Sequence, residues 1–174
     1  MTSGAGAVVR EARAGDVEAI CRFGEAHIPP HYTPLIGTAA AEEQVRLWWN
    51  ETYVGSAVAA GLVVVAESDG RLVGVGQRGR AGADHVVYKL YVHPRHRGRR
   101  IGPQLLDALT RRLPPDADRL YIEHVMANER AGAFYERAGF RVDRVEPSPT
   151  GDPARAVVWR VRQLGPSDRV PGRS

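Results

Sequence analysis

The sequence contains almost no cysteine and almost no lysine, and each shortage excludes a class of protein. Cys21 is the only cysteine among 174 residues, so an internal disulfide and a cysteine-rich metal site are both excluded. We expect Cys21 to pack on a helix face beside Ile20 and Phe23 rather than to act as a nucleophile. Lys89 is the only lysine among 24 basic residues. The arginines are scattered along the chain and aromatic residues do not interleave with them, so their charge favours a small anionic ligand at least as well as a nucleic acid.

Long apolar stretches are also missing. The longest candidate, residues 58–66, is too short to cross a membrane and is interrupted by Gly61. Residues 1–7 lack the basic start and the apolar middle of a signal peptide, so we expect a cytoplasmic protein without membrane contact. The length of 174 residues and the 43% of hydrophobic residues are typical of one globular domain. We place this domain at residues 7–164 and expect disordered tails at 1–6 and 165–174.

The hydrophobic pattern predicts an alternation of strands and helices. Because Pro29 and Pro30 cannot continue a helix, we expect the first helix to end near Ile28 and residues 31–38 to form a loop. Further helices are predicted at residues 39–53, 103–113 and 128–138. Strands are predicted at residues 7–13, 61–67, 71–78, 84–92, 119–125, 140–145 and 154–162.

The order of these elements predicts an α/β fold with a mixed sheet. The strands between residues 61 and 92 form an antiparallel meander, and the helix at 103–113 then crosses over to a strand at 119–125, which should lie parallel to the strand ending at Val92. We expect about seven strands, one parallel pair at the centre, and helices on both faces. The protein is expected to be a monomer or a homodimer, with the exposed strand at 154–162 available to pair across an interface.

Residues 92–106, VHPRHRGRRIGPQLL, join a strand to a helix through a turn rich in arginine and glycine. The first N–H groups of a helix lack intrahelical partners and the helix dipole adds positive charge, so this turn predicts a phosphate or pyrophosphate site. The alternative is a solvated basic turn that binds nothing. The site would use three arginines and two glycines, namely Arg97, Arg99, Arg100, Gly98 and Gly102.

Two segments resemble the GNAT superfamily of acyl-CoA-dependent N-acetyltransferases. Residues 90–106 are similar to the family's acetyl-CoA loop, R/Q-x-x-G-x-G/A, with Arg97 at its start and Gly102 at its end. Residues 128–140, NERAGAFYERAGF, are similar to the family's helix N-x-x-A-x-x-F-Y-x-x-x-G-F. One departure is Arg100, which replaces the central glycine of the loop. A positive φ there would strain an arginine, so we expect the position to need only a free N–H.

The resemblance implies acetyl-CoA as cosubstrate and no metal. The pyrophosphate would bind the amides of residues 97–102, and the pantetheine arm would lie along the strand that ends at Val92. In the family the sheet splays between the fourth and fifth strands, and an amide near Val92 would hold the thioester oxygen. The cofactor-binding residues implied are Leu90, Tyr91, Val92, Arg97, Gly98, Arg99, Arg100, Ile101, Gly102, Asn128 and Tyr135.

The implied reaction is the direct attack of a neutral primary amine on acetyl-CoA through a tetrahedral intermediate, which needs a proton acceptor and a proton donor. Tyr135 occupies the position of the family's general acid, and Asn128 should cap its helix. Glu123 is the best candidate base, because a carboxylate inside an apolar strand has a raised pKa. The alternatives for the base are His85, Tyr88, His31, His124 and a chain of water molecules.

The acceptor is a small-molecule or peptide amine that the sequence does not identify. His31, Tyr32 and Tyr88 are candidate acceptor-binding residues, and Trp48 or Trp49 could complete the wall of this pocket. Two adjacent tryptophans cannot share one helix face, so at least one should face a neighbour, a pocket or solvent, although core packing is the default for each. His93 and His96 have ligand-like spacing but no acidic or cysteine neighbour, so we expect no metal there. A catalytically silent acyl-CoA-binding or sensor domain is the alternative function. A nucleic-acid-binding module ranks last, because the helix at 128–138 has no role in it.

Overall fold

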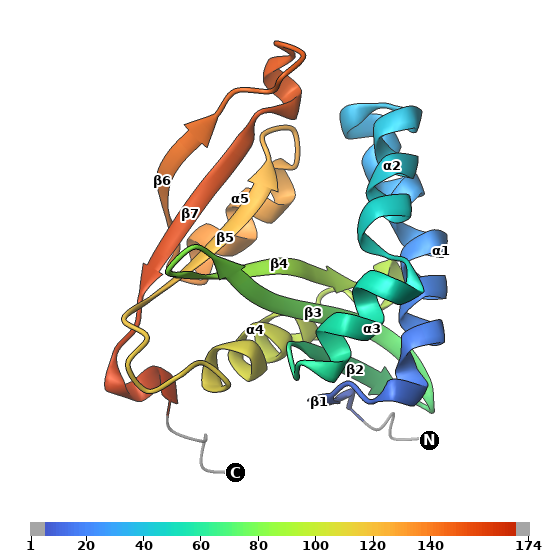
Figure 1. Ribbon diagram of the computed structural model, residues 1–174, viewed down its shortest axis with the longest axis vertical. Coiled ribbons are helices and arrows are strands. Elements are labelled where there is room, and N and C mark those ends of the chain that lie inside the picture. Colours follow the sequence, from blue (N-terminus) through green and yellow to red (C-terminus); the bar gives the residue numbers. More distant parts are fainter. Residues whose placement is uncertain (1–5, 170–174) are drawn as a thin grey trace.

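The computed structural model describes residues 6–169, in which helices pack on both faces of a sheet (Figure 1). The α-helices of this range are α1 (Val17–Ile36), α2 (Thr38–Trp48), α3 (Glu51–Ala59), α4 (Ile101–Arg111) and α5 (Glu129–Arg137). Its strands are β1 (Val8–Glu11), β2 (Val63–Ser68), β3 (Arg71–Ala81), β4 (Asp84–Val92), β5 (Arg119–Val125), β6 (Arg141–Glu146) and β7 (Val157–Gln163). Short 3-10 helices lie at Ala14–Asp16, Pro94–His96, Pro153–Arg155 and Pro166–Arg169.

The strands follow the order β1-β2-β3-β4-β5-β7-β6, and every neighbouring pair is antiparallel except β4 and β5. This topology confirms the predicted mixed sheet with one parallel pair at its centre. The prediction that residues 154–162 form an exposed strand is wrong, because β7 lies between β5 and β6. β7 buries Val158, Trp159 and Val161, whereas every residue of β6 is exposed, so the apolar strand occupies the interior position.

The pairing between β4 and β5 is short. It joins Val86 to Tyr121 and Val87 to Ile122, and no further pair follows within the described residues. β4 then contains one extra residue, Tyr88, where its register against β3 shifts. Such a bulge bends a strand and increases its twist. From this point β4 diverges from β5, and Figure 1 shows β5 and β7 rising away from β4.

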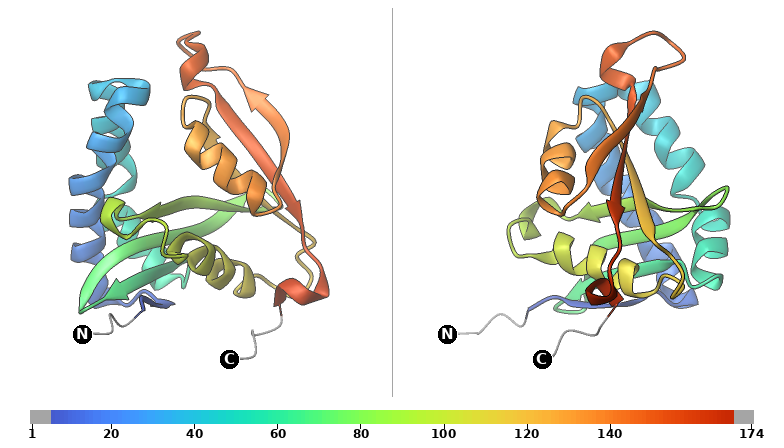
Figure 2. Two further views of the ribbon diagram at one scale, coloured as in Figure 1. Left: turned by 180° about the vertical axis from the view of Figure 1, so that it is seen from behind. Right: turned by 90° about the vertical axis from the view of Figure 1, so that its left-hand side faces the viewer.

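Helices α4 and α5 cover one face of the sheet, and α1, α2 and α3 cover the other (Figure 2). α4 packs closely on β3 because two positions of that strand are glycines. A Cβ atom at Gly74 would lie 2.9 Å from Leu105 Cδ1, and one at Gly76 would lie 3.0 Å from Leu109 Cδ1. Since Gly74 pairs with Val92, this close packing brings the start of α4 beside the end of β4.

Helix α1 is longer than predicted. It continues through Pro29, Pro30 and Pro34 to Ile36, so the predicted end near residue 28 and the predicted loop at 31–38 are wrong. A proline inside a helix leaves the carbonyl four residues earlier without a donor. The carbonyls that Pro29 and Pro30 leave free belong to residues 25 and 26, which are exposed and accessible to water. Packing of the apolar face of α1 against α2 and α3 then outweighs the lost bonds.

The predicted helix at residues 39–53 is two helices, and Asn50 separates them. Its side-chain Oδ1 accepts a hydrogen bond from Tyr53 N at 2.9 Å and so caps the start of α3. Its Nδ2 donates to the carbonyls of Arg46 and Leu47 at the end of α2. One side chain therefore satisfies both helix ends, which hydrophobic periodicity alone does not reveal.

The described range includes part of the predicted tails. Residues 166–169, which belong to the predicted C-terminal tail, form a 3-10 helix, and Asp168 lies 3.6 Å from Arg162 in an ion pair. Residues 1–5 and 170–174 of the predicted tails lie outside the described residues. No helix between residues 6 and 169 is long and apolar enough to span a membrane.

Candidate active site

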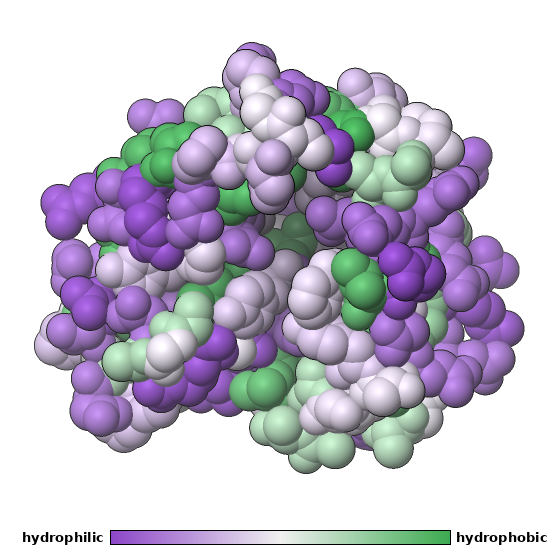
Figure 3. Space-filling view, turned by 45° about the horizontal axis from the view of Figure 1, so that its top comes forward, coloured by the Kyte–Doolittle hydropathy of each residue, from purple (hydrophilic) through white to green (hydrophobic). Residues whose placement is uncertain are grey.

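A cavity of about 1170 Å³ opens where β4 diverges from β5. Figure 3 shows this face of the molecule, which is hollowed near its centre. What we term the loop side is lined by the end of β4, the start of α4 and part of α5. What we term the aromatic side is lined by His31, Tyr32, Trp48, Trp49, Tyr53 and Tyr88. The site residues predicted from the sequence line this cavity, except Arg99, whose side chain is exposed, and His85, one of the alternative bases.

Backbone groups of β4 point into the cavity. His93 N donates to Val73 O at 2.8 Å, which fixes the phase of the hydrogen bonds between β3 and β4. In an antiparallel pair, alternate residues direct both N–H and C=O toward the same neighbouring strand. Tyr91 therefore faces β3 with its backbone groups, whereas Leu90 and Val92 direct theirs into the gap beside β5. The edge of β4 thus offers donors and acceptors to a ligand.

The loop that follows β4 presents a row of backbone amides. Within residues 6–169, the amides of residues 98–102 donate no backbone hydrogen bond. The first turn of α4 closes only at Gln104, whose N donates to Arg100 O at 3.2 Å. Free amides at a helix N-terminus carry partial positive charge and bind phosphate groups. This row and the open edge of β4 fit a phosphate-bearing ligand with an extended, amide-containing arm, as coenzyme A has.

Arg100 has a left-handed backbone conformation, with φ of 62° and ψ of 15° at the N-cap of α4. The expectation that this position needs only a free N–H is therefore wrong, since it requires a positive φ. A Cβ atom makes this conformation unfavourable by about 1–2 kcal/mol. Gly98 also has a positive φ, of 76°. At Gly102 the glycine serves close packing, because a Cβ atom would lie 3.2 Å from the Phe134 ring.

The side chain of Arg97 is held against the end of β4. Its Nη2 donates to the Tyr91 hydroxyl at 3.0 Å, and its Nε donates to Val92 O at 3.3 Å. The guanidinium also lies 5.4 Å from the centre of the Tyr91 ring. These contacts place one fixed positive charge at the mouth of the gap, beside the free amides of the loop.

Helix α5 brings Tyr135 and Asn128 into the same cavity. The Asn128 side chain accepts a hydrogen bond from Ala131 N at 3.2 Å, as the predicted cap requires. Tyr135 is 6% exposed and its hydroxyl forms no hydrogen bond with any described residue. Burial, with a smaller effect from Tyr32, raises the pKa of Tyr135 far above its ordinary value. The hydroxyl is therefore protonated at neutral pH and is free to donate to a ligand.

Glu123 lies on β5 at the aromatic side of the cavity and is half-buried. Burial raises its pKa, the nearby carboxylate of Glu146 raises it further, and Arg144 opposes both effects. Glu123 forms no ion pair within the described range. A carboxylate in this position accepts protons more readily than an exposed one.

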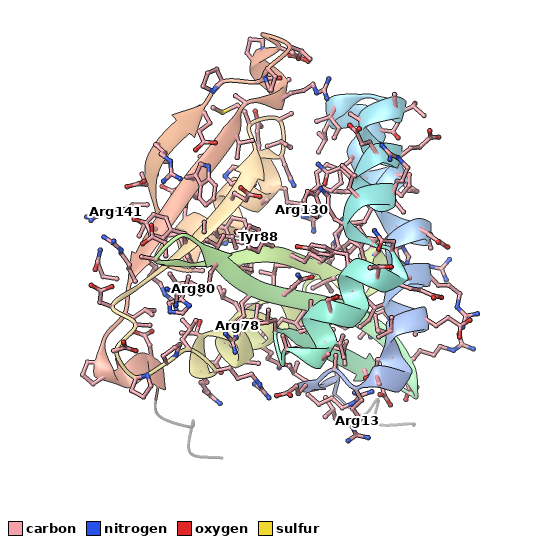
Figure 4. All side chains as sticks on the ribbon, in the orientation of Figure 1. Arg13, Arg78, Arg80, Tyr88, Arg130 and Arg141 are labelled. Atoms are coloured by element: carbon pink, nitrogen blue, oxygen red, sulfur yellow. The ribbon has the colours of Figure 1, made fainter. Side chains whose placement is uncertain are left out.

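The other candidate bases are less available. His124 uses both ring nitrogens, because Nδ1 lies 3.0 Å from Val125 O and Nε2 accepts from Arg160 at 3.1 Å. His85 does not line the cavity. The Tyr88 hydroxyl donates to Arg80 O at 2.9 Å (Figure 4).

His31 remains in contact with the cavity. Its Nε2 lies 3.4 Å from Asn128 Nδ2. Burial lowers the pKa of His31, and the positive charges of Arg97 and Arg130 lower it further, so the ring is neutral at neutral pH. Figure 4 shows Arg130 of α5 in the space that faces α1 and α2.

Sequence reasoning missed Lys89. This residue is 7% exposed and lines the cavity, and its Nζ donates to Gln77 Oε1 at 2.7 Å. Nζ also lies 4.5 Å from the centre of the Tyr53 ring and 5.3 Å from that of Trp49. Burial lowers the pKa of Lys89 to about 7. The available signal was a single lysine inside the apolar strand VVYKLYV.

The two adjacent tryptophans have different environments. Trp49 is 4% exposed and packs in the core, whereas Trp48 is 44% exposed and lines the cavity. The default of core packing is therefore wrong for Trp48, while the expectation that one of the two faces a pocket or solvent is confirmed. The rings of His93 and His96 lie 5.4 Å apart in edge-to-face contact. No group of three or more His, Cys, Asp or Glu side chains in the described part of the chain is arranged to hold a metal ion.

Comparison with known proteins agrees with this geometry. Residues 59–142 match the family model of the acetyltransferase (GNAT) domain. None of the curated proteins matches the chain in sequence. The PaiA N-acetyltransferase of Thermoplasma acidophilum, solved with coenzyme A, is similar in structure, with a TM-score of 0.76 and 14% identity over 92% of this chain and 100% of that one.

Two further solved structures share the fold. A GCN5-related N-acetyltransferase from Rhodopseudomonas palustris gives a TM-score of 0.73 at 20% identity, covering 94% of this chain and 99% of that one. YncA of Salmonella typhimurium, solved with acetyl-CoA, gives a TM-score of 0.64 at 19% identity, covering 92% of this chain and 95% of that one. The family match includes the divergence of β4 from β5, the amide-lined loop and α5. Residues 59–142 are thus similar to the GNAT acetyltransferase domain, and the described chain shares the fold of these solved acetyltransferases.

Proposed function

We propose that this protein transfers the acetyl group of acetyl-CoA to the primary amine of an acceptor. One observation carries the proposal: the open edge of β4, the loop residues Gly98 and 100–102 with their free amides, and Tyr135 all line one cavity. Acetyl-CoA supplies an acetyl thioester when it is bound. The loop amides and Arg97 would hold its phosphates, and the backbone of Leu90 and Val92 would pair with its extended arm.

The residues around the gap would then serve the proton transfers. The N–H of Val92 would donate to the thioester oxygen as that oxygen gains negative charge, and a fixed backbone donor stabilises such charge strongly. Glu123 would take a proton from the incoming amine, directly or through water. Tyr135 would give a proton to the departing sulfur, whose thiolate has a pKa of about 8.5 and needs only a modest donor.

The acceptor would enter from the aromatic side. His31, Tyr32 and Tyr88 line this side, and Tyr32 and Tyr88 both lie within the electrostatic influence of Glu123. An amine bound among these rings would therefore approach the gap beside the proposed base. Water is partly excluded there, which strengthens every charge interaction in the site.

The test combines binding with turnover. Calorimetric titration of acetyl-CoA and of CoA measures the cofactor site, and release of free thiol from acetyl-CoA with a panel of primary amines measures transfer. We expect binding of both and an acetylated product whose mass matches the amine plus one acetyl group. Binding without thiol release on the whole panel would instead indicate the silent acyl-CoA-binding domain. Absence of binding would refute the proposal.

A further inference from the structure

Lys89 has the surroundings of a ligand-binding cation rather than of a structural ion pair. It stands on β4 directly after the bulge at Tyr88, and its ammonium reaches the aromatic side of the cavity between α2, α3 and β3. A neutral amide oxygen, that of Gln77, accepts one of its three N–H groups. Gln77 is itself held by the Tyr53 hydroxyl, 3.4 Å from its Nε2.

No acidic side chain neutralises this ammonium. Lys89 forms no ion pair with a carboxylate of residues 6–169, and the titratable groups that face it are the Cys21 thiol of α1 and the Tyr53 hydroxyl of α3. Burial raises the pKa of the Cys21 thiol, so the thiol carries no negative charge at neutral pH. A buried charge without a counter-charge is unfavourable unless a ligand provides one.

The other charged residues on the aromatic side are also mostly positive. Arg80 and Arg130 also line the cavity, and Glu123 is the one acidic residue that β4 and β5 contribute to its lining. Glu123 lies near Tyr88, the residue before Lys89, since its charge raises the pKa of that tyrosine in addition to burial. The site therefore holds one negative group near the gap and a buried cation one residue beyond Tyr88, with aromatic rings around them.

We propose that the acceptor is a small primary amine that also carries a carboxylate, and that Lys89 binds this carboxylate. The inference rests on the proposed acetyl transfer, because it names the acceptor of the same site. The amine would face Glu123 and the carboxylate would replace water at the free N–H groups of Lys89. Trp48, Trp49 and Tyr53 would pack against an apolar body. A polyamine or a basic peptide would bring a second positive charge toward Lys89 and Arg130, and the site would reject it.

The first test measures binding without any reaction. Because Lys89 is the only lysine, labelling lysine with ¹³C at Cε gives one signal that belongs to this residue. Titration with phenylacetate is expected to shift the signal and to raise the pKa of Lys89 from about 7 toward the ordinary lysine value of about 10.4. The matched neutral compound, phenylacetamide, should leave both unchanged. An unchanged signal with phenylacetate up to its solubility limit overturns the proposal.

The second test measures selectivity. Acetyl transfer is compared for three pairs, phenylalanine with phenethylamine, tryptophan with tryptamine, and leucine with isoamylamine. Because the members of a pair differ in basicity, the decisive quantity is the ratio of their kcat/KM values in the wild type divided by the same ratio in Lys89→Met. We expect this quotient to be at least about tenfold, since a hydrogen bond between two charged groups is among the strong ones.

The outcomes separate this inference from the proposed function. A quotient near one in every pair overturns the role of Lys89 while leaving acetyl transfer intact. If no amine in any pair releases thiol, the proposed transfer to these acceptors fails, and the phenylacetate titration still decides whether Lys89 binds a carboxylate. Methionine is close to lysine in shape and removes a buried charge, so the variant should fold.

Discussion

Arg97 Nη2 donates a hydrogen bond of 3.0 Å to the Tyr91 hydroxyl, which ties the loop before α4 to the strand that it follows. The Nε bond to Val92 O and the contact with the Tyr91 ring hold the guanidinium in one orientation. Arg99, two residues further along, is exposed and does not line the cavity. The two arginines have the same charge but different geometry, so they form a matched pair for testing the phosphate site.

Arg97→Ala is expected to weaken CoA binding by about 10- to 100-fold, the effect of losing a hydrogen bond to a charged group. Arg99→Ala should weaken it by less than about threefold, because an exposed charge is screened by solvent and salt. Calorimetric titration of CoA into both variants measures the difference. Equal losses would mean that the loop attracts CoA by its overall charge rather than through the oriented guanidinium of Arg97.

The left-handed conformation of Arg100 leads to a stability prediction. Arg100→Gly is expected to raise the free energy of unfolding by about 1 kcal/mol, because glycine adopts a positive φ without a clash at Cβ. For a chain of this size the gain corresponds to about 2–4 °C in Tm. Arg100→Ala retains the Cβ atom and should show no such gain, and Arg99→Gly should show none either. A gain in Arg100→Ala as large as in Arg100→Gly would refute the strain argument.

The sheet and much of the site could be predicted because local sequence determines them. The run from residue 84 to residue 106 contains a strand, a glycine-bearing turn and a helix start, and these residues lie together in the fold whatever surrounds them. The segment from Asn128 to Gly139 likewise carries its own cap and its own terminator, since Gly139 has φ of 88°. These features can be predicted from a single sequence because residues close together along the chain produce them.

The features that were missed depend on contacts between distant segments. Three prolines do not end α1, because its apolar face packs against helices that come later in the chain. The burial of Lys89 follows from how Trp49 and Tyr53 pack over its ammonium, which periodicity does not report. The positive φ of Arg100 follows from the tight entry into α4, and an arginine in the sequence argues against that conformation rather than for it.

Tyr135→Phe tests the proposed acid. The hydroxyl has no partner among the described residues, so its removal should leave the free energy of unfolding nearly unchanged. We expect kcat for thiol release to fall by about 100-fold, the lower end of the range for a general acid, because a thiolate leaves readily. Tyr121→Phe is the control, since Tyr121 is 8% exposed but does not line the cavity. An unchanged kcat in Tyr135→Phe would assign the tyrosine a packing role only.

Glu123→Gln tests the proposed base through the pH profile. A base acts in its charged form, so kcat/KM of the wild type should fall as the pH decreases through the raised pKa of Glu123. The variant should lose about 100-fold in kcat/KM at neutral pH and should lack this fall. Glu146→Gln is the informative control, because removing a neighbouring negative charge should lower the pKa of Glu123 and move the fall to lower pH. A fall that persists in Glu123→Gln would assign it to another group.

Lys89→Met tests whether the buried ammonium destabilises the folded state. Burial lowers the pKa of Lys89 from 10.5 to about 7 in the folded protein, so between these values the unfolded chain binds a proton that the folded chain does not. Stability of the wild type relative to the variant therefore rises with pH across this window and is lowest below pH 7. We expect Lys89→Met to increase the free energy of unfolding near pH 6 by up to about 5 kcal/mol, from the pKa difference.

The advantage of Lys89→Met should shrink steadily as the pH rises from about 7 toward about 10, where the wild-type lysine is neutral in both states. Urea unfolding of both proteins across this range measures the difference directly, because other titrating groups are common to the two chains. Arg22→Met, which removes an exposed charge paired with Glu18, should change stability by less than about 0.5 kcal/mol at every pH in the window. A variant that is less stable than the wild type near pH 6 would mean that the contacts of the ammonium with Gln77, Tyr53 and Trp49 outweigh its burial, and that the site needs no anion to complete it.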